Sequence, residues 1–156
     1  MTDIVDSQTR SRMMSSIRGN NTSPELSVRR YLHARGFRYR LHRRDLPGKP
    51  DLVLPKYRLI IFVHGCFWHR HEGCFYATSP ATRKDFWRKK LEGNTARDKR
   101  QQGELISSGW RVLVIWECGL KHQFDDIQTI EYKITAPEVL DEWPEHPPRI
   151  RHHHKR

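Results

Sequence analysis

The chain has 156 residues, and its 29 Lys and Arg outnumber 18 Asp and Glu to give a formal net charge of +11. This length suits one domain whose core needs no disulfide framework. No segment approaches the ~20 consecutive apolar residues of a membrane-spanning helix, and the N-terminus lacks the basic head and apolar run of a signal peptide. We therefore expect a cytoplasmic protein. The positive charge favours a polyanionic partner, although basic residues that only solubilise the surface would give the same value.

The N-terminal part of the chain predicts an arm, a helix and a strand. Residues 8–18 place three large apolar side chains among basic and small polar ones, which indicates a short amphipathic arm. A helix is expected over residues 24–35, with Ser23 as its N-cap, proline at its first position and Gly36 after its last turn. Residues 37–41 then alternate apolar and basic side chains, as on a strand with one buried face.

Two β-rich runs, DLVL and RLIIFVH, flank the break PKYR and predict a hairpin. If residues 56 and 57 form the centre of a tight turn, Asp51 lies opposite Phe62 and beside Val63 and His64. A longer turn would shift this register by one residue. Because residues paired across two strands lie ~5 Å apart, the hairpin brings an acidic side chain to the end of the following strand.

The C-terminal half predicts further helices and one apolar strand. Residues 82–108 are highly charged and mostly helical in pattern, and Gly93 suggests a break into two helices. WRVLVIWE, residues 110–117, is typical of a central strand covered on both faces. A weaker helix is expected over residues 125–143, before a polar, proline-rich tail. The order helix, three strands, helix, strand predicts an α/β fold in which helices cover a small mixed sheet.

The stretch HGCFWHRHEGC holds two of the three cysteines. With a third cysteine at the end of the apolar strand, it offers a candidate metal-ligand set: Cys66, His71, Cys74 and Cys118. Three thiolates and one imidazole suit tetrahedral zinc, and a filled set of four protein ligands is structural rather than catalytic. The spacing also permits His69 or His64 as the imidazole ligand, and buried free thiols are the alternative to a metal site.

Several motifs together resemble the very short patch repair (Vsr) DNA mismatch endonucleases. They are PGKPD, FVHGCFWH, the Cys/His stretch, PATRKDFW, N-x2-RD over residues 94–98, and GWRVLVIWEC, and they span about residues 7–120 in the same order. The resemblance implies a restriction-endonuclease-like mixed sheet flanked by helices, with a structural zinc site. It also implies an endonuclease that nicks duplex DNA 5′ of the thymine in T:G mismatches left by deamination of 5-methylcytosine.

The same resemblance implies how the chain is organised and where it acts. We expect one endonuclease domain over residues 1–143, in which residues 1–20 form a flexible arm that contacts DNA, followed by a basic disordered tail over residues 144–156. The expected protein is a bacterial monomer that works at the nucleoid, with mismatch-repair proteins as candidate partners.

Catalytic roles follow from the resemblance, position by position. Asp51 resembles the acid that binds Mg²⁺, and the main-chain carbonyl of Val63 resembles a second Mg²⁺ ligand, where other members have threonine. His69 resembles the general base, a role that suits histidine near neutral pH because an unperturbed imidazole has a pKa of about 6.5. Glu25 and His64 resemble the residues that hold metal-bound waters. Apart from the resemblance, an Asp that follows Pro is more often a turn residue, and His69 is also a candidate zinc ligand.

The resemblance also assigns contacts with DNA. Three apolar side chains match wedges that enter the base stack beside the mismatch: Met14, Phe67 and Trp68. Such wedges cost less unstacking energy at a mismatched pair. Lys90 and Asn94 are candidates for reading base edges, and five cations are expected to contact phosphates: Arg83, Lys84, Arg88, Lys89 and Arg97. The alternatives are that the aromatics cap the core and that the polar residues are simply exposed helix positions.

Two other functions compete with the mismatch endonuclease. One is a restriction-type nuclease that acts on matched DNA, and the other is a non-catalytic DNA-binding repair module. The presence of Asp51, His64 and His69 argues against a non-catalytic module.

Overall fold

The computed structural model describes residues 22–150, and the chain forms two compact units, residues 1–38 and 39–156. The first unit contains helix α2 (Ser23–Ala34), which confirms the predicted helix. Its N-cap is Thr22 rather than Ser23, because the Thr22 hydroxyl accepts a hydrogen bond from the Glu25 amide at 3.4 Å. Gly36 follows the helix with a positive φ of 85°, which glycine adopts without strain. The predicted arm over residues 8–18 lies outside the described residues.

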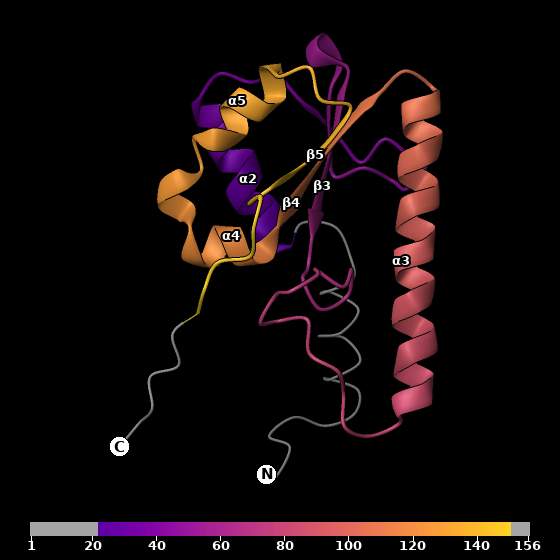
Figure 1. Ribbon diagram of the computed structural model, residues 1–156. Coiled ribbons are helices and arrows are strands. Elements are labelled where there is room, and N and C mark those ends of the chain that lie inside the picture. Colours follow the sequence, from indigo (N-terminus) through magenta and orange to yellow (C-terminus); the bar gives the residue numbers. More distant parts are fainter. Residues whose placement is uncertain (1–21, 151–156) are drawn as a thin grey trace. The chain divides into compact units, whose positions relative to one another are not determined.

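The second unit is built on one five-stranded sheet (Figure 1). Its strands are, in chain order, β1 (Arg40–Leu41), β2 (Leu52–Leu54), β3 (Leu59–His64), β4 (Arg111–Trp116) and β5 (Leu140–Trp143). They lie side by side in that same order. Pairs β1/β2 and β2/β3 are antiparallel, whereas β3/β4 and β4/β5 are parallel, so the predicted mixed sheet is confirmed.

The hairpin β2/β3 keeps the predicted register, with Leu52 opposite Ile61 and Leu54 opposite Leu59. Its connection differs from a two-residue turn. A short 3₁₀ helix, η1 (Pro55–Tyr57), is followed by Arg58 in a left-handed conformation with φ of 49°. The register survives because this connection closes the strands at the same pair of residues.

Helix α3 (Lys84–Ser107) is continuous over 24 residues, so the predicted break at Gly93 is wrong. A glycine inside a helix costs about 1 kcal/mol relative to alanine, which a long helix tolerates when its buried positions pack well. Leu91 and Leu105 supply that packing, and both are buried. No atom lies within 4 Å of a Cβ placed at Gly93, so this glycine faces open space.

The segment after β4 differs most from expectation. The chain forms α4 (Glu117–His122) directly after β4, and the predicted helix over residues 125–143 is replaced by the 3₁₀ helix η2 (Phe124–Asp126), α5 (Thr129–Thr135) and strand β5. The strand forms because residues 140–143 pair in parallel with the free edge of β4. Gly119 of α4 permits a close approach here, since a Cβ at this position would lie 2.6 Å from Pro144 and 2.7 Å from Trp143.

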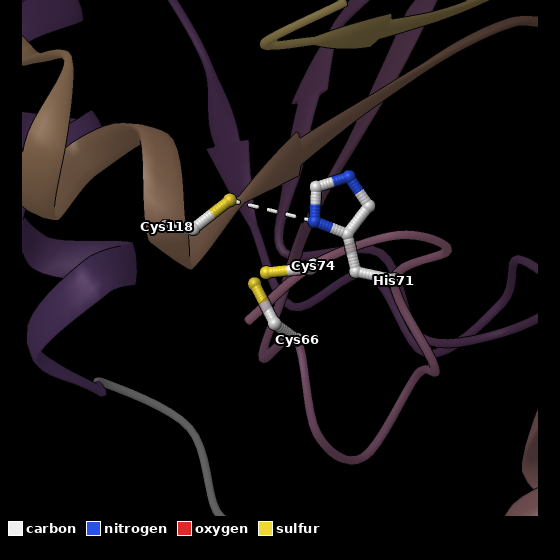
Figure 2. A group of neighbouring side chains, drawn as sticks. All are labelled: Cys66, His71, Cys74 and Cys118. Carbon is white, nitrogen blue, oxygen red and sulfur yellow. Dashed lines mark hydrogen bonds between the residues drawn. The ribbon is translucent and has the colours of Figure 1, made fainter. Parts of the chain in front are cut away.

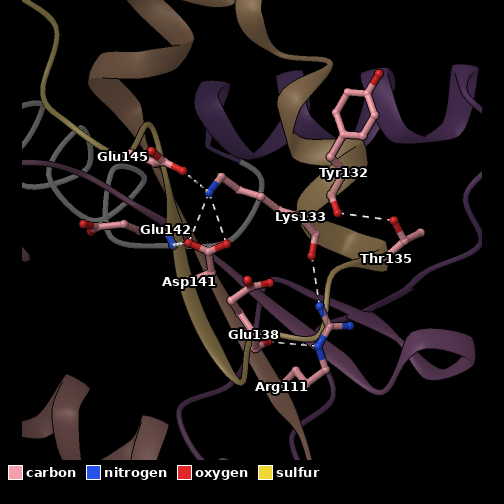
Figure 3. A network of polar contacts seen from close by, with 8 residues as sticks. All are labelled: Arg111, Tyr132, Lys133, Thr135, Glu138, Asp141, Glu142 and Glu145. Carbon is pink, nitrogen blue, oxygen red and sulfur yellow. Dashed lines mark hydrogen bonds and ion pairs between the residues drawn. The ribbon is translucent and has the colours of Figure 1, made fainter.

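Two basic side chains hold α5 against the sheet (Figure 3). The Arg111 guanidinium donates to main-chain carbonyls at four positions: Tyr57, Lys133, Ile134 and Glu138. The Lys133 ammonium bonds both Asp141 carboxylate oxygens and Glu145, each at 3.1 Å. The ion pairs therefore extend from α5 across β5 to a residue in the predicted tail.

Helices cover both faces of this sheet, with α3 on one side and α4 and α5 on the other (Figure 1). On the α3 side, the core is formed by buried residues of four elements: Val53, Ile60, Phe62, Leu105, Val112 and Val114. This core ends at Cys66, Trp116 and Cys118. Within residues 22–150, no helix is long and apolar enough to cross a membrane.

Candidate functional site

The Cys/His cluster, which comprises Cys66, His71, Cys74 and Cys118, lies where the loop after β3 meets the first turn of α4 (Figure 2). The candidate ligand atoms all lie within 4.8 Å of one another, and Cys118 Sγ is 3.4 Å from His71 Nδ1. Two main-chain bonds shape the loop: the His71 amide donates to the Cys66 carbonyl at 3.0 Å, and the Cys74 amide donates to the His71 carbonyl at 3.2 Å. The structure thus brings His71, not His69 or His64, to the three cysteines.

The three thiols of this cluster do not share one protonation behaviour. Hydrogen bonding from Cys118, helped by His71, lowers the pKa of Cys66 to about 4. The pKa of Cys118 is raised, first because its thiol donates to Cys66 and then because it is buried. Burial raises the pKa of Cys74. Even without a cation, one thiolate is stabilised, and this soft, mostly buried donor set could hold a metal ion.

Asp51 lies directly before β2 and is tied to the end of β3. Its Oδ2 accepts a hydrogen bond from the Val63 amide at 2.7 Å, as the hairpin register predicts. The start of β2 and the Val63 amide of β3 together fix the position of this carboxylate. It therefore lies at the C-terminal end of β3, where the loop with the Cys/His cluster begins.

A second cluster joins the histidine pair, His64 and His69, to Asp98 of α3. The imidazole rings are stacked, with centroids 3.7 Å apart, and His69 Nδ1 lies 2.6 Å from Asp98 Oδ2. Burial, followed by the nearby His69, holds the pKa of His64 well below its usual value, so His64 is neutral. When Asp98 accepts a hydrogen bond from Nδ1–H of His69, the Nε2 atom carries the lone pair and can accept a proton.

Asp98 was missed as a site residue, although it stands in the N-x2-RD motif. Its signal is helical phase: on a continuous helix, residues 87, 94 and 98 share one face. A break at Gly93 would place residue 87 on a different helix from residues 94 and 98, so the predicted break hid their common face.

Trp116 connects the two clusters. Its ring stacks on His71 with centroids 4.1 Å apart, and its edge contacts His64 at 5.4 Å. The indole nitrogen donates to Glu142 of β5 at 2.9 Å. The candidate metal ligand and the buried histidine therefore rest on one anchored side chain at the end of β4.

The aromatic cluster consists of Phe67, Trp68 and Trp87. Phe67 and Trp68 meet edge to face at 5.1 Å, and Trp87 of α3 lies 5.8 and 5.9 Å from them. The Arg70 side chain supports the loop by donating to the carbonyls of Phe67, Ala77 and Thr78. All three aromatic residues are half-buried, so they are neither core residues nor fully exposed ones. Sequence reasoning missed Trp87, which shares the helix face of Asp98.

Beside this cluster, a groove of about 1100 Å³ runs between α3 and residues 70–81. Trp87 and Leu91 contribute apolar surface to it, and Lys84 and Arg88 add charge. The five cations predicted to contact phosphates are all exposed: Arg83, Lys84, Arg88, Lys89 and Arg97. Lys90 is half-buried. Asn94 donates its amide to the Trp68 carbonyl at 3.1 Å.

Two predicted site residues do not belong to the described part of the second unit. Glu25 belongs to the first unit, where it is buried and bonds Arg29 at 2.6 Å. Its predicted role toward metal-bound water stays a prediction. Met14 lies outside the described residues, and so does its predicted role as a wedge.

The mixed sheet flanked by helices is the arrangement of a restriction-endonuclease-like fold. A family model described as "DNA mismatch endonuclease Vsr" matches residues 2–75. The type II nicking enzyme V.XorIIP of Xanthomonas oryzae is 51% identical over 120 residues, which cover 77% of this chain and 88% of that protein. The DNA mismatch endonuclease Vsr of Escherichia coli is 43% identical over 121 residues, with 78% and 77% covered. The chain belongs to the Vsr family of DNA mismatch endonucleases.

Proposed function

We propose that this chain nicks duplex DNA 5′ of the thymine in a T:G mismatch and depends on Mg²⁺. The observation that carries the proposal is one loop with two functions. The half-buried aromatics Phe67 and Trp68 stand directly before His69, whose imidazole is paired with Asp98. Two aromatic side chains that can enter a base stack therefore adjoin a candidate general base in the sequence.

We propose that the Cys/His cluster binds zinc as a structural ion. Three sulfur donors and one imidazole nitrogen, gathered within 4.8 Å, fit a closed tetrahedral site. Such an ion would fasten an irregular loop of residues 65–81 to the first turn of α4. The aromatic cluster and His69 would then be held on a rigid support.

We propose that Asp51 and the main-chain carbonyl of Val63 hold the catalytic Mg²⁺. A carboxylate fixed at 2.7 Å from the Val63 amide provides a hard oxygen donor at the strand end, which is the ligand type that Mg²⁺ prefers. When bound, the ion neutralises charge on the phosphate and favours ionisation of water. His64 is buried and neutral beside His69, which suits a hydrogen-bonding role toward bound water.

The proton from the attacking water passes to Nε2 of His69 in this proposal. Asp98 fixes the proton on Nδ1, orients the ring and stabilises the imidazolium that forms. Stacking on His64 restricts rotation of the ring. His69 is 25% exposed, so its ring can reach a substrate that lies on the surface.

DNA recognition combines two kinds of contact. The exposed cations of α3 would bind phosphates without reading sequence. Phe67, Trp68 and Trp87 would enter the base stack where a mismatched pair is easiest to open. A relative named as a mismatch endonuclease and others named as nicking enzymes support both the substrate class and the single-strand cut. The expected monomeric state and mismatch-repair partners stay predictions.

The test uses end-labelled duplexes that carry one T:G pair in a panel of flanking sequences, each beside its matched duplex. We expect the wild-type protein with Mg²⁺ to cut only the T strand, on the 5′ side of the mismatched thymine, and Asp51→Ala to bind without cutting. Equal cutting of matched DNA would instead indicate a restriction-type nuclease. Mismatch binding with no cut in any flanking sequence would indicate a binding module.

A further inference from the structure

One peptide group joins Trp68 to His69, and it is held at both ends. The Trp68 carbonyl accepts a hydrogen bond from Asn94 Nδ2 at 3.1 Å, and the His69 amide donates to the Gly65 carbonyl at 3.1 Å. A peptide group is planar, so hydrogen bonds at its carbonyl and at its amide together restrain its orientation. The directions in which the Trp68 and His69 side chains leave the backbone are then fixed together.

The same helix holds the two neighbouring side chains. Asn94 and Asp98 stand one turn apart on one face of α3, and Asp98 bonds the imidazole of His69 at 2.6 Å. Helix α3 therefore bonds the backbone of Trp68 through Asn94 and the imidazole of His69 through Asp98.

We infer that Asn94 is a positioning residue that couples the Trp68 wedge to the orientation of His69. This inference rests on the proposed function. When Trp68 enters the base stack, any displacement of its backbone is opposed by the bond from Asn94. Asn94 belongs to the same helix, α3, whose Asp98 aligns the imidazole of His69. Insertion at a mismatch and correct placement of the base thus become one event, and a loop that is not seated leaves His69 misaligned.

The bonds of Asn94 support this role over that of a base reader. Its Nδ2 is engaged by the Trp68 carbonyl, and its Oδ1 accepts from Arg97 at 3.4 Å. Asn94 is also half-buried. Both polar ends of the amide therefore contribute to the internal arrangement of the loop and helix.

The experiment compares Asn94→Leu with wild type in single-turnover nicking of a T:G duplex, at enzyme concentrations that saturate the DNA. Leucine keeps the size of the side chain and removes the donor. A misplacement of about 1 Å can cost ~10²-fold in rate, so we expect a ten- to hundredfold slower cut. The dissociation constant for the same duplex should change less than about threefold, since phosphate and wedge contacts persist. Gln102→Leu also replaces an amide by methyl groups, about two turns later on α3, and should leave both values unchanged.

A double variant tests the coupling itself. Because Asn94 and Asp98 act on one peptide and its ring, the rate loss in Asn94→Leu/Asp98→Asn should be smaller than the product of the two single losses. Losses that multiply would overturn the inference. A tenfold weaker mismatch affinity with an unchanged saturated rate would also overturn it and would make Asn94 a base reader. If Asn94→Leu lowers the melting temperature sharply, Asn94→Ser decides by the same criteria. Failure of the wild-type protein to nick any T:G duplex would overturn the proposed function instead.

Discussion

Replacement of Asp98 by asparagine removes the charge that faces His69 and changes little else in shape. The wild-type contact is 2.6 Å long, and Asp98 is only 13% exposed, so solvent screens it weakly. Hydrogen bonds to a charged group contribute about 1.5–3 kcal/mol. In the proposed reaction, this contribution is largest when the imidazole carries the proton taken from water.

A tenfold change in rate corresponds to about 1.4 kcal/mol. Asp98→Asn should therefore slow single-turnover nicking of a T:G duplex by roughly ten- to hundredfold. Binding to the duplex should be almost unchanged, because Asp98 contacts the loop and not the proposed phosphate ligands. Both values are measured on one labelled duplex, the first by gel analysis of the cut strand and the second by titration without Mg²⁺.

The matched control is Glu104→Gln, which makes the same carboxylate-to-amide change at an exposed position of α3. It should cut at the wild-type rate. A rate for Asp98→Asn within about threefold of wild type would refute the assigned role, since the charge would then contribute under 1 kcal/mol to the reaction.

Three further outcomes are expected. A zinc chelator should release one metal equivalent per chain, lower the melting temperature and make all three cysteines reactive toward a thiol reagent; reactive thiols before chelation would argue against the site. Lys133→Met should lower the free energy of unfolding by about 1 kcal/mol. Burial lowers the pKa of Lys133, but its contacts with Asp141 and Glu145 together outweigh burial and raise that pKa. The contribution of Lys133 is therefore complete below pH 10.5 and lost as pH rises through the folded-state pKa, so urea titrations at pH 8 and 11.5 should show a smaller difference between variant and wild type at the higher pH. Mismatch binding should fall ~10³-fold between 50 and 200 mM salt, and a flat titration would contradict the phosphate contacts assigned to α3.

The parts of the fold that could be predicted are those governed by local pattern. The register of β2 against β3 follows from two apolar runs and a short connection. It predicts Asp51 beside Val63, and the hydrogen bond from the Val63 amide to Asp51 confirms this position. Strand β4 is equally clear, because an unbroken apolar run of five residues, 112–116, has to be buried on both faces. Strand β5 could not be predicted, since LDEW has no such pattern and pairs only because the edge of β4 is available.

The candidate site was predictable where its residues are close in sequence and uncertain where they are not. Spacing left three histidines open as ligands, and only the turn closed by the His71 amide on Cys66 brings one of them to Cys118. Trp87 and Asp98 were missed because they reach the loop from a helix that begins 18 residues after Cys66. Their contacts depend on the long-range packing of α3, which a local pattern does not specify.

The shared position of Trp116 argues against treating the Cys/His cluster as a separate structural unit. His71 stacks on one side of the indole, His64 contacts its edge, and His64 in turn stacks on His69. Packed side chains of this kind transmit displacement because interiors have few voids. A shift of His71 on metal loss would therefore move the ring that supports the buried histidine, and through it the candidate base. Trp116 therefore links the fastening of the loop to the orientation of His69, the candidate general base.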